Sequence, residues 1–443
     1  MRPRPDPGRL AHARPGTDPG RLATPYTSAV GTSTAPGSGV SPDELSALEA
    51  TVRAGQSAYM SALEQLCNID CGSYSPAGVN RVATWVAAAF ADLGGDVERR
   101  PDPSGRYGDT VIGTFRGRDA AGPRVLLIGH MDTVFSDGTV AERPFATDGD
   151  IARGAGVTDM KGGLLAGVHA LAALRALRAG WQDLPFERIT YVANPDEEIG
   201  SPSSTPHIRE IAASADLCFV LECARANGDF VSSRKGIADL RLTVRGRAAH
   251  AGVEPEQGRN AIHAGARMVE RIQALNGRWS GVSANVGVFQ AGTRPNIVPD
   301  LANLEVDVRG VTSTELEEAI AAIRGIAAEP GVPDVTVEIS QMAGWQPMEK
   351  LERSGRLAEH VKALAGRIGF STTDVGTGGA SDANTTSGMG VPSIDGLGPV
   401  GGRDHSPDEY LEISSIVPRT TLIAAALLAA GRDPEVEGWR ARP

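Results

Sequence analysis

The feature that most constrains the fold of this chain is a short apolar run, VLLIG at residues 125–129, which holds no polar side chain and leads directly to His130. A strand with one face in water alternates apolar and polar residues, whereas a strand of a parallel sheet is covered on both faces and is apolar throughout. We therefore predict a buried parallel strand here. Helical and strand patterns alternate after it, at 161–180, 188–194, 204–213 and 217–222, which predicts an α/β fold with a mixed, mainly parallel sheet and helices on both faces.

The pattern changes after Lys235. Four β-rich runs and two helical patterns follow within about 110 residues, a normal size for a compact α+β domain. The strands are predicted at 237–249, 284–292, 303–310 and 335–340, and the helices at 259–275 and 313–328. From Trp345 the alternating pattern returns. We therefore expect a catalytic domain of residues 41–234 and 345–443, interrupted by an inserted domain of residues 235–344.

Residues 1–40 differ in composition from everything after them. They hold seven Pro, six Gly and five Arg, and the phrase DPGRLA occurs twice, from Asp6 and from Asp18. Such a segment buries too little apolar area to offset the entropy cost of ordering it, so we predict a disordered tail. It lacks the apolar core of a secretory signal, which makes the cytoplasm the expected location.

Composition excludes several classes of function. The 443 residues carry a formal net charge of −11, from 43 Lys and Arg against 54 Asp and Glu, whereas a nucleic-acid-binding surface needs clustered basic residues. We find no uncharged apolar run near the roughly 18 residues that span a bilayer. We therefore expect neither a nucleic-acid partner nor a membrane. The four Cys residues are too few for a disulfide framework, which favours a reducing compartment.

Acidic and His residues recur where the predicted strands end, and ligands of open α/β sheets bind at the carboxyl ends of the strands. Asp132 follows His130 by two residues and projects to the same side, so His130 could bind a metal while Asp132 orients its ring. The other residues of this kind are Asp159 before a helix, Glu197 and Glu198 after the strand at 188–194, Glu222 at the end of the next strand, and His405.

Each of these residues also has a structural explanation when taken alone. His130 could be a buried structural histidine, Asp159 a helix cap, and residues 196–198 a solvated acidic turn. Together, two His and three carboxylates suit divalent ions such as zinc. Two ions would need a bridging carboxylate and would activate a shared water. In the adjacent Glu pair, one carboxylate can bind metal while the other acts as a general base.

Five blocks, in this order, resemble the M20 family of dinuclear zinc amidohydrolases and its glutamate carboxypeptidase branch. They are GHMDTV, GAGVTDMKGG, NPDEEIGS, GRAAHAG, and GGASDAN followed by DGLGPVGGRDHS, and the resemblance covers roughly residues 45–430. It implies that one zinc binds to His130 and Glu222 and a second zinc to Glu198 and His405, with cobalt or manganese as alternative ions. Asp159 corresponds to the ligand that bridges the two ions.

The resemblance also implies catalytic roles. Asp132 corresponds to the partner that orients His130, and Glu197 to the general base that moves a proton from water to the leaving amine. The bond from Asp159 to Met160 corresponds to one that is cis in the family. His250, in GRAAHAG, matches a residue that reaches the active site of the partner subunit and stabilises the oxyanion, which implies a homodimer built on the inserted domain. Without the resemblance, a surface His on a strand is the simpler interpretation.

Four further residues are candidates for substrate contacts. Asn296 and Arg309 resemble family residues that contact the scissile carbonyl or the substrate carboxylate. Gly378 and Gly379 could offer backbone N–H groups to that carboxylate, although a tight turn also explains them. One position departs from the carboxypeptidase pattern, in which Arg often precedes Pro where the chain re-enters the catalytic domain. This chain has Gln346 there, and Gln lacks the charged bidentate grip of Arg.

We therefore expect a hydrolase that uses two zinc ions to cleave an amide bond in a small peptide or N-acyl amino acid, releasing a C-terminal amino acid such as glutamate. The nearest alternative is a deacylase or dipeptidase of the same architecture. A catalytically inactive metal-binding scaffold is a second alternative, which the intact Glu197 and the complete ligand set argue against. A nucleotide-binding α/β protein is a third, but we find no GxGxxG after the first strand and no P-loop.

Overall fold

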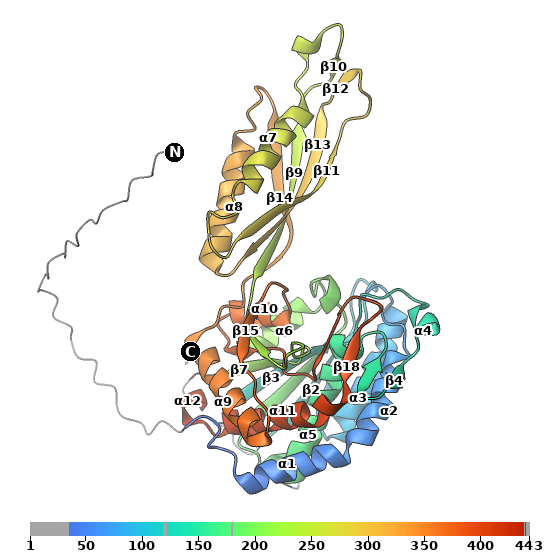
Figure 1. Cartoon of the computed structure of the whole chain (residues 1–443), viewed down its shortest axis with the longest axis vertical. Helices are drawn as coiled ribbons and strands as arrows, with labels where there is room; N and C mark the ends of the chain where they lie inside the picture. The colour runs from blue at the N-terminus through green and yellow to red at the C-terminus, as the bar shows by residue number, and fades with distance from the viewer. Residues whose placement is uncertain (1–34, 118–121, 179, 438, 440–443) are drawn as a thin grey trace, which may run out of the picture. The chain divides into compact units, whose positions relative to one another are not determined.

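The computed structural model describes residues 35–117, 122–178, 180–437 and 439 of the chain (Figure 1). A six-stranded sheet organises its larger body, in the order β1-β2-β6-β3-β7-β16. The four strands from β6 to β16 run parallel, and β2 and β1 are added antiparallel at one edge. The bounds are β1 Asp96–Arg100, β2 Thr110–Arg116, β3 Arg124–His130, β6 Arg188–Asn194, β7 Leu217–Val220 and β16 Ser393–Ile394. The predicted mixed, mainly parallel sheet is confirmed.

Strand β3 is covered on both faces, as its apolar run predicted. Val125 and Leu127 belong to the main hydrophobic core, whereas Leu126 and Ile128 belong to a smaller core on the opposite face, and each is at most 1% exposed. The main core is built with α1 Pro42–Ala54, α2 Gln56–Cys67, α3 Pro76–Asp92, α5 Gly162–Leu177, α9 Glu352–Ile368 and α11 Ile416–Gly431. The smaller core is covered by α6 Thr205–Ala212 and α10 Asp382–Gly388.

Helix α11 lies within the main core. The stretch Ile413–Gly431 is the one segment of the described residues that is long and apolar enough to cross a membrane, with a mean hydropathy of 1.6. However, 83% of its apolar 18-residue window is buried inside the protein. Its only charged residue, Arg419, donates hydrogen bonds to the carbonyls of Gly228, Gly396 and Gly398. The packing of this helix against α1, α5 and α9 accounts for its apolar composition.

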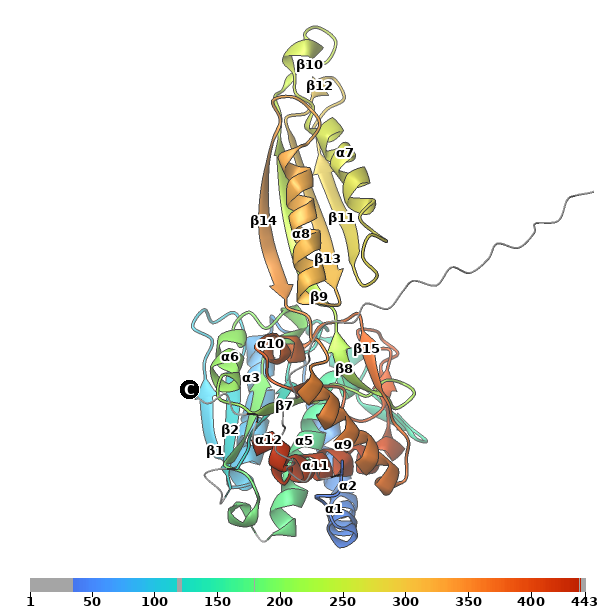
Figure 2. The ribbon, with the colours of Figure 1, turned by 90° about the vertical axis from the view of Figure 1, so that its left-hand side faces the viewer.

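Residues 236–345 form a second sheet with its own core, which contains all the predicted strands and helices of this region. The strand order is β11-β13-β9-β14, with every pair antiparallel. Figure 2 shows both helices on one face of this sheet, and the alternating burial of β9 and β13 reflects that one-sided cover. The bounds are β9 Gly236–Arg245, α7 Ala261–Gln273, β11 Ser283–Ala291, β13 Leu301–Gly310, α8 Ser313–Ala328 and β14 Thr336–Trp345.

The remaining elements are short. A four-stranded sheet follows the order β17-β18-β5-β4, and two-stranded pairs are formed by β8 with β15 and by β10 with β12. The strand bounds are β4 Ala146–Asp148, β5 Ile151–Arg153, β8 Phe230–Arg234, β10 Ala249–His250, β12 Ile297–Val298, β15 Asp374–Thr377, β17 Gly401–Gly402 and β18 Tyr410–Glu412. The short helices are α4 Thr139–Glu142, η1 Val157–Lys161, η2 Trp181–Asp183, η3 Glu197–Ile199, η4 Pro255–Gln257, η5 Ile413–Ser415 and α12 Pro434–Glu437.

The predicted disordered tail of residues 1–40 extends too far. Residues 35–40 form a turn on the folded body, in which Val40 is 1% exposed. Arg367 donates to the carbonyl of Gly37 and Arg432 to that of Gly39, so partners from distant helices anchor the turn. The first 34 residues of the predicted tail lie outside the described residues.

Two smaller expectations are confirmed. The Asp159–Met160 peptide bond is cis, as the family resemblance implied. The four cysteines are buried and free of disulfides, and they are Cys67, Cys71, Cys218 and Cys223.

Candidate metal centre

The candidate ligands on three neighbouring strands meet at one edge of the main sheet. His130 is the last residue of β3, Glu197 and Glu198 form the η3 turn after β6, and Glu222 lies two residues beyond β7. Because β3 lies between β6 and β7 and all three run parallel, their carboxyl ends bring these side chains together.

Asp159 lies between the two histidines. Its Oδ1 atom is 3.1 Å from Nε2 of His130, and its Oδ2 atom is 3.1 Å from Nε2 of His405. Asp159 is carried by the η1 turn before α5, and His405 by the loop between β17 and β18. Each oxygen of this one carboxylate thus faces a different imidazole, as a carboxylate that bridges two cations would.

The other carboxylates complete two groups of donor atoms. Glu198 Oε2 lies 3.1 Å from His405 Nε2, and Glu222 Oε1 lies 3.7 Å from His130 Nε2. Donor atoms of His130, Asp159 and Glu198 lie within 4.8 Å of one another, as do those of His130, Glu197 and Glu222. We call His130, Asp159, Glu198, Glu222 and His405 the ligand cluster, and Glu197 lies beside it.

Asp132 contacts both the His130 ring and the turn that carries Glu197 and Glu198. Its Oδ1 atom is 3.3 Å from Nδ1 of His130, the ring nitrogen that faces away from Asp159. The same carboxylate accepts hydrogen bonds from the backbone N–H groups of Glu197 and Glu198, at 3.1 and 3.2 Å, and from the hydroxyl of Ser73 at 2.6 Å. Asp132 is fully buried, so one side chain orients both the His130 ring and the turn that carries the glutamates.

Glu409 supports the site, although no sequence motif predicts this role. Its carboxylate accepts hydrogen bonds from the backbone N–H groups of Gly156, Thr158 and Asp159, at 3.0, 2.9 and 3.0 Å, and it is 2% exposed. The sequence offered one signal, an acidic residue four positions after His405. Only the fold brings that residue beneath the turn that carries Asp159.

Burial and like charge raise the pKa of the glutamates. Desolvation is the main cause of the raised pKa of Glu197 and of Glu222, and neighbouring carboxylates add to it. Asp159 behaves differently because its hydrogen bonds with His130 and His405 outweigh its burial and lower its pKa. Hydrogen bonds to Asp159 and Glu198 raise the pKa of His405 to about 10.

The donor set fits divalent cations. Among the described residues, no Lys or Arg forms an ion pair with a carboxylate of the ligand cluster or with Glu197. Burying several carboxylates without a cation is unfavourable, and bound divalent ions would neutralise them. Two imidazoles and three carboxylates are the ligand types that zinc, manganese and cobalt accept.

His250 and Asn296 lie together, but not in the ligand cluster. His250 ends the short strand β10, which pairs with β12, and the carbonyl of Asn296 accepts a hydrogen bond from Ala251 N–H at 3.1 Å. Both residues are exposed. The pair β10–β12 lies at the end of the second sheet opposite to the end where β9 begins and β14 finishes (Figure 1). Among the described residues, neither side chain contacts the ligand cluster.

Arg309 and the two candidate glycines do meet. Arg309 donates to the carbonyl of Gly378 at 2.9 Å and is paired with Asp307 at 3.0 Å. The carbonyl of Gly379 accepts from the buried Arg234 at 3.0 Å. The segment 378–379 is therefore held by two guanidinium groups through its carbonyls.

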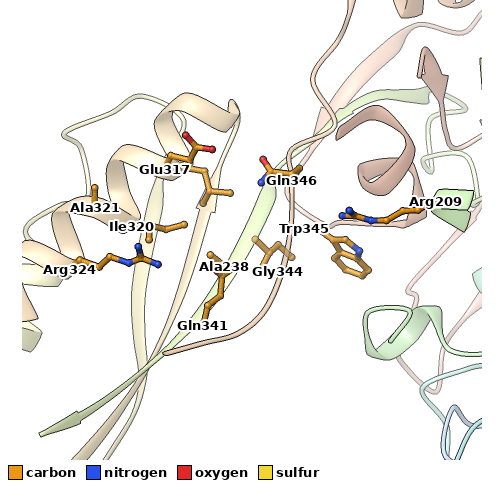
Figure 3. Close-up of a pocket in the computed structure, with 12 residues that line it drawn as sticks. Arg209, Ala238, Glu317, Ile320, Ala321, Arg324, Gln341, Gly344, Trp345 and Gln346 are labelled. Atoms are coloured by element: carbon orange, nitrogen blue, oxygen red, sulfur yellow. The ribbon is translucent and has the colours of Figure 1, made fainter. Parts of the chain in front are cut away.

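Gln346 and Trp345 line a separate cavity of about 360 Å³ where β14 leads back to the main sheet (Figure 3). Arg209 of α6 and Arg324 of α8 lie at its opposite sides. The backbone carbonyl of Gln346 accepts from the Asn384 side chain at 2.9 Å. This cavity contains no member of the ligand cluster.

Comparison with known proteins connects this geometry to one family. The family described as "Peptidase family M20/M25/M40" matches residues 126–429. Carboxypeptidase G2 from Pseudomonas sp. (strain RS-16) is 32% identical over 379 residues, which cover 84% of this chain and 89% of that protein. A succinyl-diaminopimelate desuccinylase from Leptothrix cholodnii is 27% identical over 75% of this chain and 89% of its own length.

Solved structures share the fold. The crystal structure of aminopeptidase PepT from Bacillus cereus superimposes with a TM-score of 0.69, at 22% identity, over 84% of this chain and 98% of that one. At this level of identity the likeness concerns the fold alone.

Proposed function

This chain belongs to peptidase family M20/M25/M40 and is a hydrolase of the carboxypeptidase, deacylase and dipeptidase type, and from that premise we propose that it cleaves an amide bond with the help of two divalent cations, of which zinc fits best. One observation carries the proposal. The two oxygens of Asp159 face the two histidines at 3.1 Å each, so one carboxylate can serve two cations.

The proposed ligands divide into two sets that share Asp159. His130 and Glu222 would hold one cation, and Glu198 and His405 would hold the other. When bound, the two cations polarise the amide carbonyl and lower the pKa of water. Asp132 keeps the distal nitrogen of His130 engaged, which leaves Nε2 free to bind metal.

Glu197 is the proposed general base. It lies next to the ligand cluster but forms no ion pair among the described residues, and its pKa is raised mainly by burial. A raised pKa suits a carboxylate that must take a proton from water and then deliver it to the leaving amine nitrogen. The hydrogen bond from its backbone N–H to Asp132 fixes its position.

We further propose that residues 235–344 form a dimerisation domain, and that residues 41–234 and 345–443 form the catalytic domain. His250, at the end of β10, and Asn296, directly before β12, are exposed, and among the described residues neither contacts the ligand cluster. Their exposure supports a role at the site of a second copy, where His250 would steady the oxyanion that forms from the amide carbonyl.

The similar proteins support only part of the proposed substrate class. The similarity to a carboxypeptidase supports release of a C-terminal amino acid, which the sequence resemblance implies is one such as glutamate. Arg309, Gly378 and Gly379 are the proposed contacts for its carboxylate. Gln346 supplies no guanidinium, and this favours a deacylase or dipeptidase as the second candidate. Both candidates act on small peptides or N-acyl amino acids.

A hydrolysis screen with metal control tests the proposal. Purified protein is stripped with a chelator, reconstituted with zinc, cobalt or manganese, and assayed on dipeptides, N-acyl amino acids and folate-type amides. We expect activity to disappear on chelation and to return with about two equivalents of metal per chain. Full activity in the stripped protein, or binding of less than one equivalent, would contradict the proposal.

A further inference from the structure

A cavity of about 530 Å³ opens beside the ligand cluster. It is lined by segments 72–75 and 133–137 and by Glu198 and Ile199. We call it the Tyr74 cavity. This volume lies within the range of about 300–1,000 Å³ that is usual for small-molecule sites. Because Glu198 is a proposed metal ligand, the cavity adjoins the proposed metal site.

The walls of the Tyr74 cavity are fixed relative to the ligand cluster. Backbone hydrogen bonds join the two segments, from Ser73 N–H to the carbonyl of Thr133 and from Thr133 N–H to that of Cys71. The Ser73 hydroxyl donates to Asp132, which also holds the backbone of Glu198. The cavity is therefore built into the same hydrogen-bonded frame as the candidate ligands.

Large apolar side chains in the cavity remain exposed. Tyr74 is 65% exposed and Val134 is 42% exposed, and Phe135 is half-buried beside them. Exposed apolar and aromatic groups that line a concave site next to polar groups are typical of ligand pockets. These side chains suit an aromatic or branched aliphatic group.

The charge of the lining is negative. Asp137 accepts a hydrogen bond from the Ser75 hydroxyl, and among the described residues it forms no ion pair that would balance its charge when Glu198 is engaged with metal. The lining contains no Lys or Arg. Arg143 lies near, with its guanidinium carbon 4.8 Å from the centre of the Phe135 ring, but it does not line the cavity. A substrate carboxylate in the cavity would thus meet an acid and no cationic side chain among the lining residues.

We propose that the Tyr74 cavity receives the acyl part of the amide substrate, and that this part is an uncharged group with an aromatic or branched aliphatic body. The inference rests on the proposed function and specifies its substrate class. The acid-lined cavity would repel the free carboxylate of the released amino acid. The cavity therefore suits the part of the substrate on the acyl side of the scissile bond. Acyl groups that end in a carboxylate, such as succinyl, are disfavoured for the same reason.

The test compares the hydrolysis of substrates that differ in the acyl group but release the same amino acid. The zinc-loaded enzyme is assayed on N-benzoyl, N-acetyl and N-succinyl derivatives of L-glutamate and of L-alanine. We expect kcat/KM for benzoyl to exceed that for succinyl by about tenfold or more in each series, which is the scale of pocket discrimination. Equal or faster hydrolysis of the succinyl compounds would overturn the proposal.

Two variants assign the preference to the cavity. Val134→Ala should raise KM for the benzoyl substrates about fivefold and change KM for the acetyl substrates by less, because the larger acyl group loses more apolar contact area. Asp137→Asn should improve kcat/KM for the succinyl substrates about threefold. The matched controls are Val311→Ala, at a valine that is 41% exposed, and Asp148→Asn on the exposed strand β4. If neither cavity variant changes the ratio of kcat/KM for benzoyl to kcat/KM for succinyl substrates, the proposal is overturned.

Binding separates this inference from the proposed function. Affinities for the same benzoyl and succinyl compounds are measured by calorimetry on the zinc-loaded Glu197→Gln protein. If the benzoyl compounds bind more tightly than the succinyl compounds, and Val134→Ala weakens their binding, the proposed role of the cavity is supported. This holds even if the active enzyme hydrolyses none of the compounds, a result that would contradict only the proposed function. Equal binding of both acyl types would refute the cavity, whether or not the enzyme is active.

Discussion

The Glu409 carboxylate accepts a hydrogen bond from the backbone N–H of Asp159 at 3.0 Å, across 250 positions of sequence. Glu409 follows His405 by four residues, so one buried side chain connects the turn that carries the proposed bridging ligand to the loop that carries another ligand. The geometry of the ligand cluster therefore depends on a residue that binds no metal in the proposed arrangement.

Glu409→Gln should weaken metal binding by about tenfold or more, which is the usual effect of losing a group that orients ligands. The amide keeps the size of the side chain but turns an NH₂ donor toward a backbone N–H, which leaves a buried donor unpaired. The measurement is a competitive zinc titration, with circular dichroism to verify the fold. Asp408→Asn, at an exposed neighbour, is the control, and equal zinc affinity in both variants would contradict the positioning role.

Glu197→Gln should retain two equivalents of metal and lose activity by about 10²- to 10⁴-fold, the range that general acid–base groups contribute. Gln fills the same space but cannot take a proton. Metal content is measured by atomic absorption on the same samples as kcat. Near wild-type turnover would eliminate Glu197 as the base, whereas lost metal would make it a ligand.

Gly163→Ala should destabilise the protein by several kcal/mol. A Cβ atom at this position of α5 would lie 1.7 Å from the carbonyl oxygen of Leu221, next to the proposed ligand Glu222, and backbone atoms cannot move aside cheaply. The matched control is Gly366→Ala in α9, where a Cβ would meet nothing within 4 Å. That change should stabilise the fold by about 0.5–1 kcal/mol. Thermal unfolding of the two variants should therefore shift in opposite directions.

The ion pairs of Glu44 should make the free energy of unfolding depend on pH in the acidic range. Its hydrogen bond with Arg432 is the main reason that the pKa of Glu44 falls to about 2, although burial opposes the shift. Because the folded pKa lies below the ordinary value of 4.5, the contribution is complete above pH 4.5 and is lost as the pH falls toward 2.

Glu44→Gln should accordingly lower the free energy of unfolding by about 1 kcal/mol at pH 7, in line with partly screened ion pairs, and by less at pH 3.5. Urea unfolding of chelated protein at both pH values measures the difference without a contribution from metal loss. Glu49→Gln, whose partner Arg53 is exposed, is the control and should show little effect at either pH. A Glu44→Gln effect that stays constant between the two pH values would refute the linkage.

The sequence by itself determined the parts of this protein that depend on local pattern. The apolar run at 125–129 predicted a strand covered on both faces, and Val125 and Leu126 do pack into opposite cores. The strand-end positions of His130, Glu198 and Glu222 predicted their convergence, because parallel strands end at a common edge of the sheet.

Only the tertiary structure decided how distant segments complete the site. The contact of Asp159 with two histidines, the support by Glu409 and the cavity at Tyr74 all join segments whose separation in sequence carries no periodic signal. The same reason explains the error at residues 35–40. Their composition is that of a tail, but Arg367 and Arg432, more than 300 positions away, bind their carbonyls. Such contacts depend on strand order and helix packing, which local residue patterns do not encode.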